Sequence, residues 1–158
     1  MALKNDKFNG EDRENLIVEQ WSKAVEMADT TIDKRINSTN VYITIEAALI
    51  AVMSFVKDWI NYVVPIVGIT VAVIWLLSIR SYKSLSKIKY TVINEIEEML
   101  PIKPFKYEWE LLIANKEYKH VTTLERCLPI IFGVLFAVIL IGVIFFGKQV
   151  AVEVGGAQ

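Results

Sequence analysis

Three long apolar runs dominate the hydrophobic pattern of this chain, and they cover residues 41–56, 59–79 and 128–147. An α-helix needs about 20 predominantly apolar residues to cross a hydrocarbon core about 30 Å thick. The second and third runs reach that length, and the first comes close to it. The pattern therefore predicts an all-α integral membrane protein with three transmembrane helices.

Outside these runs, apolar residues recur at intervals of three and four, which is typical of one face of an α-helix. The first such stripe consists of Ile17, Trp21, Ala24, Val25, Ala28, Ile32 and Ile36. The second consists of Ile88, Val92, Ile96, Met99 and Leu100. We expect the first amphipathic helix to run into the first span. The second should extend the second span into the cytoplasm until Pro101 ends it.

The segment after Pro101 is expected to form a rigid turn and then a short amphipathic helix, because Pro104 follows closely. The apolar residues of this short helix are Phe105, Trp109, Leu112 and Ile113. The last helix has a start signal in Thr122 and Glu125, whose spacing matches a capping box. Small residues at intervals of four predict close helix contacts within the spans. These pairs are Ala47 and Ala51, Gly68 and Ala72, and Gly133 and Ala137.

The Lys and Arg residues are distributed unevenly, and their distribution predicts the topology. Fifteen of the 17 lie in residues 1–40 and 80–127, and cytoplasmic segments carry an excess of Lys and Arg. The N-terminus is therefore expected inside and the C-terminus outside. The predicted organisation is a cytoplasmic N-terminal helix in 1–40, a transmembrane hairpin in 41–79, a cytoplasmic helical region in 80–127, a third transmembrane helix in 128–147 and an extracytoplasmic tail in 148–158.

Two aromatic residues stand at the start of the second run. Trp59 and Tyr62 follow directly on the short link between the first two spans. Amphipathic aromatic rings favour the headgroup level of a bilayer. We therefore expect both residues to be interface anchors on the outer side of the membrane.

Glu46 is the one ionisable residue inside an apolar run, and an acid within a membrane is costly enough to suggest a function. It could reach the cytoplasmic interface or form an ion pair with Arg80 or Arg126. It could instead face a water-filled lumen in an oligomer, where it would attract cations or relay protons. A third alternative is a protonated carboxyl that forms hydrogen bonds between helices.

Residue types that carry catalysis or bind metals are scarce in this chain. His120 is the only histidine, Cys127 is the only cysteine, and no Gly-rich phosphate loop is present. The acids Glu95, Glu97 and Glu98 are expected on the solvent side of their helix, as a solvated charge run would be. We therefore expect no enzyme, no metal site and no cofactor. Because Lys and Arg alternate with acids, we also expect no nucleic-acid partner.

Four segments in a fixed order resemble the RipA family of octameric bacterial inner-membrane proteins. They are WSKAVEMAD at 21–29, KRINSTNVYITI at 34–45, RSYKSL at 80–85 and VINEIEEMLPIKPFKYEW at 92–109. The resemblance implies a helical homo-octamer, multi-pass in the bacterial cytoplasmic membrane, and no established biochemical activity. Glu46 stands where the family pattern leads us to expect a neutral amide.

Two functional hypotheses follow. The first is a structural or scaffolding membrane oligomer, surrounded by lipid, whose cytoplasmic helices pack subunits together or recruit a partner protein. Its candidate assembly contacts are Trp21, Ile32, Phe105 and Trp109. The alternative is an oligomeric channel or pore with Glu46 near the lumen, supported by the polar residues Thr44, Ser54 and Thr70 within the spans.

Overall fold

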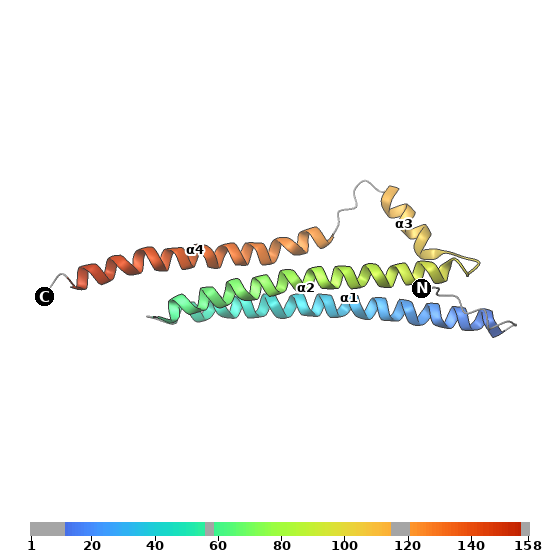
Figure 1. The fold of residues 1–158 in the computed structure, drawn as a ribbon, viewed down its shortest axis with the longest axis horizontal. Helices are drawn as coiled ribbons and strands as arrows, with labels where there is room; N and C mark the ends of the chain where they lie inside the picture. The colour runs from blue at the N-terminus through green and yellow to red at the C-terminus, as the bar shows by residue number, and fades with distance from the viewer. Residues whose placement is uncertain (1–11, 56–58, 115–120, 156–158) are drawn as a thin grey trace. The chain divides into compact units, whose positions relative to one another are not determined.

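The computed structural model describes residues 12–55, 59–114 and 121–155, and over these ranges it contains helices and no strand. The helices are α1 (Asp12–Met53), α2 (Ile60–Glu97), α3 (Pro104–Ala114) and α4 (Val121–Gly155) (Figure 1). Within the described residues, α1, α2 and α4 are long and apolar enough to cross a membrane. The prediction of an all-α chain with three candidate spans is therefore confirmed.

The chain divides into two compact units. Unit 1 consists of Met1–Arg35 and Ser81–His120, and unit 2 consists of Ile36–Arg80 and Val121–Gln158. Helices α1 and α2 each continue from one unit into the other, whereas α3 belongs to unit 1 and α4 to unit 2. Unit 2 therefore contains the three apolar runs, and unit 1 contains most of the residues of the two predicted apolar stripes.

The core of unit 1 forms where α1 packs on α2. Ala24 and Ala28 of α1 are buried with Ile93 and Ile96 of α2. Partly buried side chains around them are Ile17, Trp21, Val25, Tyr90, Val92, Met99 and Phe105. Two small alanines on α1 let the helices approach closely, so the larger isoleucines of α2 fill the space between them.

The predicted apolar stripes are wrong at two positions, where the side chains are exposed and not packed. Ile36 is exposed, and Ile88 is 59% exposed, whereas Ile93, which was not part of the predicted stripe, is fully buried. Five residues correspond to roughly 140° of rotation in an α-helix. Ile88 and Ile93 therefore cannot face the same partner, and the packing of α1 selects the face that carries Ile93.

Unit 2 brings α2 and α4 into close contact through small residues. A Cβ atom added at Gly68 would lie 2.5 Å from the ring of Phe136, which is fully buried, so only glycine fits there. Gly133 of α4 faces Ala72 of α2, because a Cβ at Gly133 would lie 3.6 Å from the Ala72 Cβ. The predicted small-residue contacts therefore exist here. The pair on α1, Ala47 and Ala51, is exposed instead.

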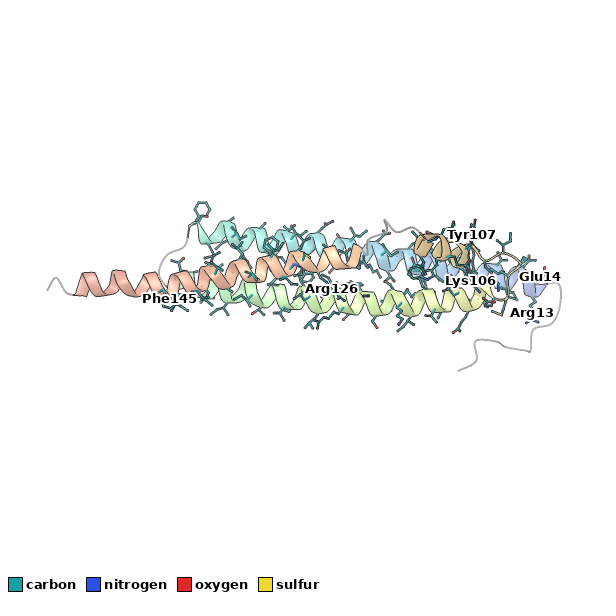
Figure 2. All side chains as sticks on the ribbon, turned by 90° about the horizontal axis from the view of Figure 1, so that it is seen from above. Arg13, Glu14, Lys106, Tyr107, Arg126 and Phe145 are labelled. Atoms are coloured by element: carbon teal, nitrogen blue, oxygen red, sulfur yellow. The ribbon has the colours of Figure 1, made fainter. Side chains whose placement is uncertain are left out.

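The apolar helices carry many exposed side chains, among them Phe145 on α4, which is 69% exposed (labelled in Figure 2). Trp59 is also exposed, and Tyr62 is at the border of exposure. Such surfaces are suited to lipid or to a neighbouring subunit. The role of Trp59 and Tyr62 as interface anchors stays a prediction.

Helix boundaries agree closely with the turn signals. Helix α2 ends at Glu97, and a turn separates it from Pro101. Helix α4 begins at Val121, one residue before the predicted cap Thr122. The side chain of Thr122 lies outside the described residues, so the capping box stays a prediction.

Candidate functional site

An aromatic and polar contact sets the register of α1 against α2 in unit 2. The hydroxyl groups of Tyr42 and Ser78 are 2.9 Å apart. The ring of Tyr42 also stacks on that of Trp75, with 5.7 Å between centroids and 14° between planes. Trp75 in turn contacts Phe132 of α4 at 6.2 Å between ring centroids. Tyr42 therefore lies level with residues 75–78 of α2.

Glu46 lies one turn beyond Tyr42 on α1 and is 0% exposed. Neither of its carboxyl oxygens has a hydrogen-bond partner. The indole Nε1 of Trp75 is likewise buried without a partner. Buried polar groups are normally paired because an unpaired one forfeits its hydrogen bonds to water. Glu46 is therefore the least satisfied acid among the described residues of unit 2.

The register explains why Glu46 forms no ion pair. Four residues past Tyr42 is roughly 6 Å of helix rise, which places Glu46 near residues 71–74 of the antiparallel α2. Arg80 is exposed and lies roughly 9–13 Å away along the axis. Helix α4 is antiparallel to α2, and Arg126 precedes Phe132 by six residues, so Arg126 lies on the Arg80 side of Trp75, away from Glu46. An ion pair of Glu46 with Arg80 or Arg126 is thus absent.

The burial of Glu46 also bears on whether its carboxyl reaches the membrane interface or a lumen. A side chain that reaches the membrane interface would be exposed, and so would one that lines a lumen between subunits. Glu46 is 0% exposed on the isolated protomer. This geometry favours a carboxyl enclosed by the helices of its own protomer.

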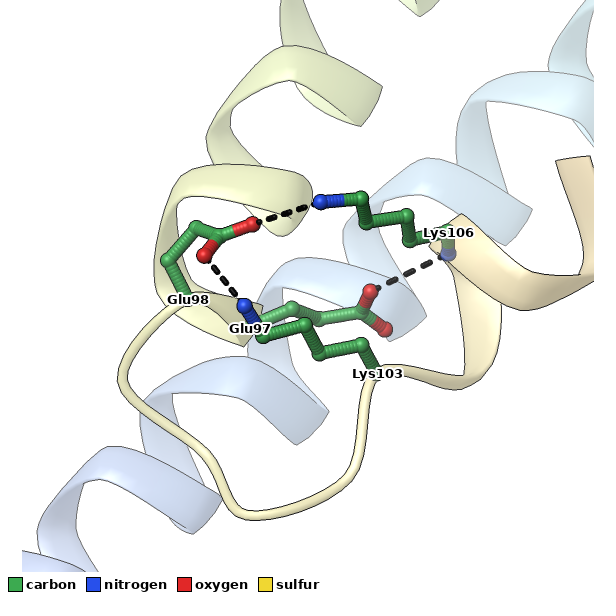
Figure 3. Close-up of polar contacts among 4 residues, drawn as sticks. All are labelled: Glu97, Glu98, Lys103 and Lys106. Carbon is green, nitrogen blue, oxygen red and sulfur yellow. Dashed lines mark hydrogen bonds and ion pairs between the residues drawn. The ribbon is translucent and has the colours of Figure 1, made fainter. Parts of the chain in front are cut away.

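A second buried acid, Glu97, joins α2 to α3 in unit 1. Its Oε1 accepts a hydrogen bond from the backbone N–H of Phe105 at 3.0 Å. Its Oε2 accepts one from the N–H of Lys106 at 3.3 Å (Figure 3). Because α3 begins at Pro104, these N–H groups belong to its first turn and have no partner within the helix. Glu97 therefore caps α3 from the last turn of α2.

The expectation that Glu95, Glu97 and Glu98 all face solvent is wrong for Glu97, which is 1% exposed. Glu95 and Glu98 are exposed as expected. The physical reason is that α3 folds back onto the end of α2, and its free N–H groups attract the nearest carboxylate. The sequence contains a feature that could have predicted a cap on α3. Pro104 is suited to the first position of a helix, and the N–H groups that follow such a start need an acceptor.

Charged side chains at the surface also form contacts across the α2–α3 junction. Lys103 and Lys106 both donate hydrogen bonds to the carboxylate of Glu98, the latter at 3.3 Å (Figure 3). The bond from Lys103, followed by that from Lys106, lowers the pKa of Glu98 below its ordinary value. Because all three side chains are in water, each pair adds little stability on its own.

The predicted assembly contacts fall into two groups. Trp21 and Phe105 contact each other within unit 1, with 6.0 Å between ring centroids, and Tyr90 packs on Phe105 at the same distance. Ile32 is half-buried. Trp109, by contrast, is 52% exposed. Of these four side chains, Trp109 offers the largest free surface to a neighbour.

Among the described residues no group of three or more His, Cys, Asp and Glu side chains is placed to hold a metal ion. His120 lies outside the described residues. The distinctive polar features of the described chain are therefore the enclosed Glu46 and the α2–α3 junction formed by Glu97, Glu98, Lys103 and Lys106.

Comparison with known proteins identifies a family. The sequence profile of the octameric membrane protein family (8xMP) matches residues 18–145, which include segments of both units and all three candidate spans. No curated protein and no solved structure matches the chain.

Proposed function

This chain belongs to the octameric membrane protein family, and from that premise we propose that it is a non-enzymatic structural protein that assembles as a homo-octamer. The proposed location is the bacterial cytoplasmic membrane, which the resemblance to the RipA family supports. The proposed topology has the N-terminus inside and the C-terminus outside. It is supported by the 15 of 17 Lys and Arg residues in residues 1–40 and 80–127.

The observation that carries the proposal is that α3 is apolar on two opposite sides. Phe105 and Leu112 are half-buried on its inner face. Two positions along a helix correspond to roughly 200° of rotation, so Tyr107 lies opposite Phe105. Tyr107 and Leu111 are both exposed. A helix with apolar residues on both sides needs a second surface to cover it.

The contacts at the α2–α3 junction hold this helix in place. Glu97 caps its first turn, and Phe105 packs against Trp21 and Tyr90. The exposed side of α3 is therefore presented by an anchored helix, which lowers the entropy lost when a partner binds. In an octamer, a neighbouring copy of this chain is the partner available at each protomer.

The test is the stability of the octamer when exposed α3 residues are truncated. Tyr107→Ala and Leu111→Ala, on the side of α3 opposite Phe105, should each lower the fraction of octamer in mild detergent, since truncating an aromatic residue that is buried in an interface costs roughly 3–5 kcal/mol and a leucine roughly 2–5 kcal/mol. Glu110→Ala, at an exposed polar position between them, is the matched control and should leave the octamer intact. Multi-angle light scattering after size-exclusion chromatography gives the mass of each species.

A second measurement separates contact with protein from contact with lipid. If α3 lies on the bilayer instead, both variants should remain octameric, and brominated lipids should quench the fluorescence of Trp109 in a protein whose other tryptophans are replaced by phenylalanine. Unchanged octamers together with such quenching would contradict the proposed packing of subunits through α3.

A further inference from the structure

We propose that Glu46 is a proton-binding site. Its side chain is a carboxylic acid that stays protonated at neutral pH because the helices of a single protomer enclose it. The inference goes beyond the proposed assembly and does not depend on it. It requires only that α1, α2 and α4 span the membrane and pack as they do in unit 2.

The first step is that nothing outside the protomer reaches Glu46. Its side chain is 0% exposed without any neighbouring subunit present. A lipid headgroup, bulk water or a charge on another subunit therefore cannot compensate a negative charge there unless the helices move apart. Both of its oxygens also lack a donor within the protomer.

The second step is that no cation of unit 2 neutralises it. Among the described side chains of this unit, the charged groups other than Glu46 are Arg80 on α2 and Glu125 and Arg126 on α4. Arg80 is exposed, and the helix register places both arginines roughly 9 Å or more from Glu46 along the axis. Glu125 is an acid and would oppose a second negative charge. An ionised Glu46 would therefore be an unpaired charge in an apolar bundle, which is strongly unfavourable.

The third step is that a proton fits this site better than a metal cation. Alkali and alkaline-earth cations require several oxygen ligands around them. The hydroxyls of Tyr42 and Ser78 bond to each other. Those of Thr44 and Thr70 donate to the backbone carbonyls of Asn40 and Ile66 in their own helices. A proton needs only one of the two carboxyl oxygens.

Proton binding is then linked to the packing of unit 2. A protonated Glu46 favours the closed arrangement in which α1 encloses it, and an ionised Glu46 favours an arrangement that admits water. By linkage, any movement that hydrates Glu46 releases its proton, and a rise in pH favours that movement. The expected direction is loss of the closed packing as the pH rises.

Infrared spectroscopy of the purified full-length protein in lipid tests the proposal directly, whatever its oligomeric state. At pH 7.5 the acids in water are ionised, so a C=O stretching band of a protonated carboxylic acid, shifted by deuterium exchange, is expected from Glu46. The band should disappear in Glu46→Gln and persist in the matched control Glu125→Gln. Absence of the band from the wild-type protein, or its loss only in Glu125→Gln, would overturn the proposal.

One further variant and one change of salt complete the experiment. If Glu46→Gln does not fold, Glu46→Asp should move the band without removing it, because the carboxyl then sits in a different environment. Replacing choline chloride by sodium chloride at constant ionic strength should leave the band intensity unchanged. A decrease with sodium would show that a metal cation replaces the proton, contrary to the proposal.

Discussion

Unit 1 and unit 2 each enclose one glutamate, and the two carboxyls are in opposite situations. Glu97 lies against the start of a helix and accepts two hydrogen bonds from backbone N–H groups. Glu46 lies against the middles of helices, where every backbone N–H is already bonded to a carbonyl, and neither of its oxygens has a partner. Equal burial therefore does not give equal chemistry. The state of each carboxyl depends on whether the surrounding backbone has N–H groups that are free to donate a hydrogen bond.

The two buried glutamates have different roles in their units. In unit 1 the buried carboxylate fixes α3, the helix that we propose packs on a neighbouring subunit. In unit 2 the buried carboxyl makes no bond that holds helices together, and the contact of α2 with α4 depends on Gly68, Phe136, Ala72 and Gly133. One acid is thus part of the scaffold, and the other is a site that can change its protonation.

Among variants of the two buried glutamates and their neighbours, the largest effect is expected from placing a permanent charge at position 46. Arginine is not deprotonated in proteins, so Glu46→Arg should destabilise insertion of α1 by about 3 kcal/mol. Glu46→Gln, which is neutral and resembles the protonated acid in size and shape, should change stability far less than Glu46→Arg. The yield of membrane-inserted protein and its thermal unfolding in detergent measure both. Equal behaviour of the two variants would remove the distinction between the units.

The next effect is expected at the α2–α3 junction. Glu97→Ala leaves two N–H groups of α3 without an acceptor, and loss of such a cap costs about 0.5–2 kcal/mol. Hydrogen exchange at the amides of Phe105 and Lys106 should become faster by the corresponding factor of about 2 to 30. Glu95→Ala, at an exposed position of the same helix turn, is the control. Unchanged exchange in Glu97→Ala would mean that α3 does not depend on this cap.

The smallest effect is expected from Glu98, because its partners Lys103 and Lys106 are exposed. Its folded-state pKa lies below the ordinary value of 4.5. Its contribution to stability is therefore fully present above pH 4.5 and is lost as the pH falls through the lower folded-state pKa. Thermal unfolding of the wild-type protein and of Glu98→Gln should differ slightly at pH 7 and converge in acid. A difference that grows on acidification would contradict the assignment.

The burial of Glu46 also gives an expectation for ion flux if the protein is a channel. If Glu46 is enclosed within one protomer, any ion flux through liposomes that contain the octamer should have the same cation selectivity in wild type and Glu46→Gln across pH 4–8. This result is expected because a side chain without exposed surface cannot contact a passing ion. A loss of cation selectivity in Glu46→Gln would place the carboxyl in a lumen instead.

Much of the fold was predictable because it depends on local properties of the chain. Runs of apolar residues predict spans from length alone, and Pro101 and Pro104 predict the break between α2 and α3 from backbone chemistry. The buried faces were less predictable. Several neighbouring faces of α2 carry isoleucine, and only contact with Ala24 and Ala28 of α1 selects the one with Ile93.

The sequence by itself determined the three apolar helices and the short helix after the two prolines, since these follow from hydrophobicity and from the missing N–H of proline. It also identified Glu46 as unusual, because an acid stands out within an apolar run. Only the tertiary structure decided that Glu97 is a cap and that Glu46 has no partner. The reason is physical: the state of a buried carboxyl depends on which donors lie within hydrogen-bond distance, and helices distant in sequence supply or withhold those donors.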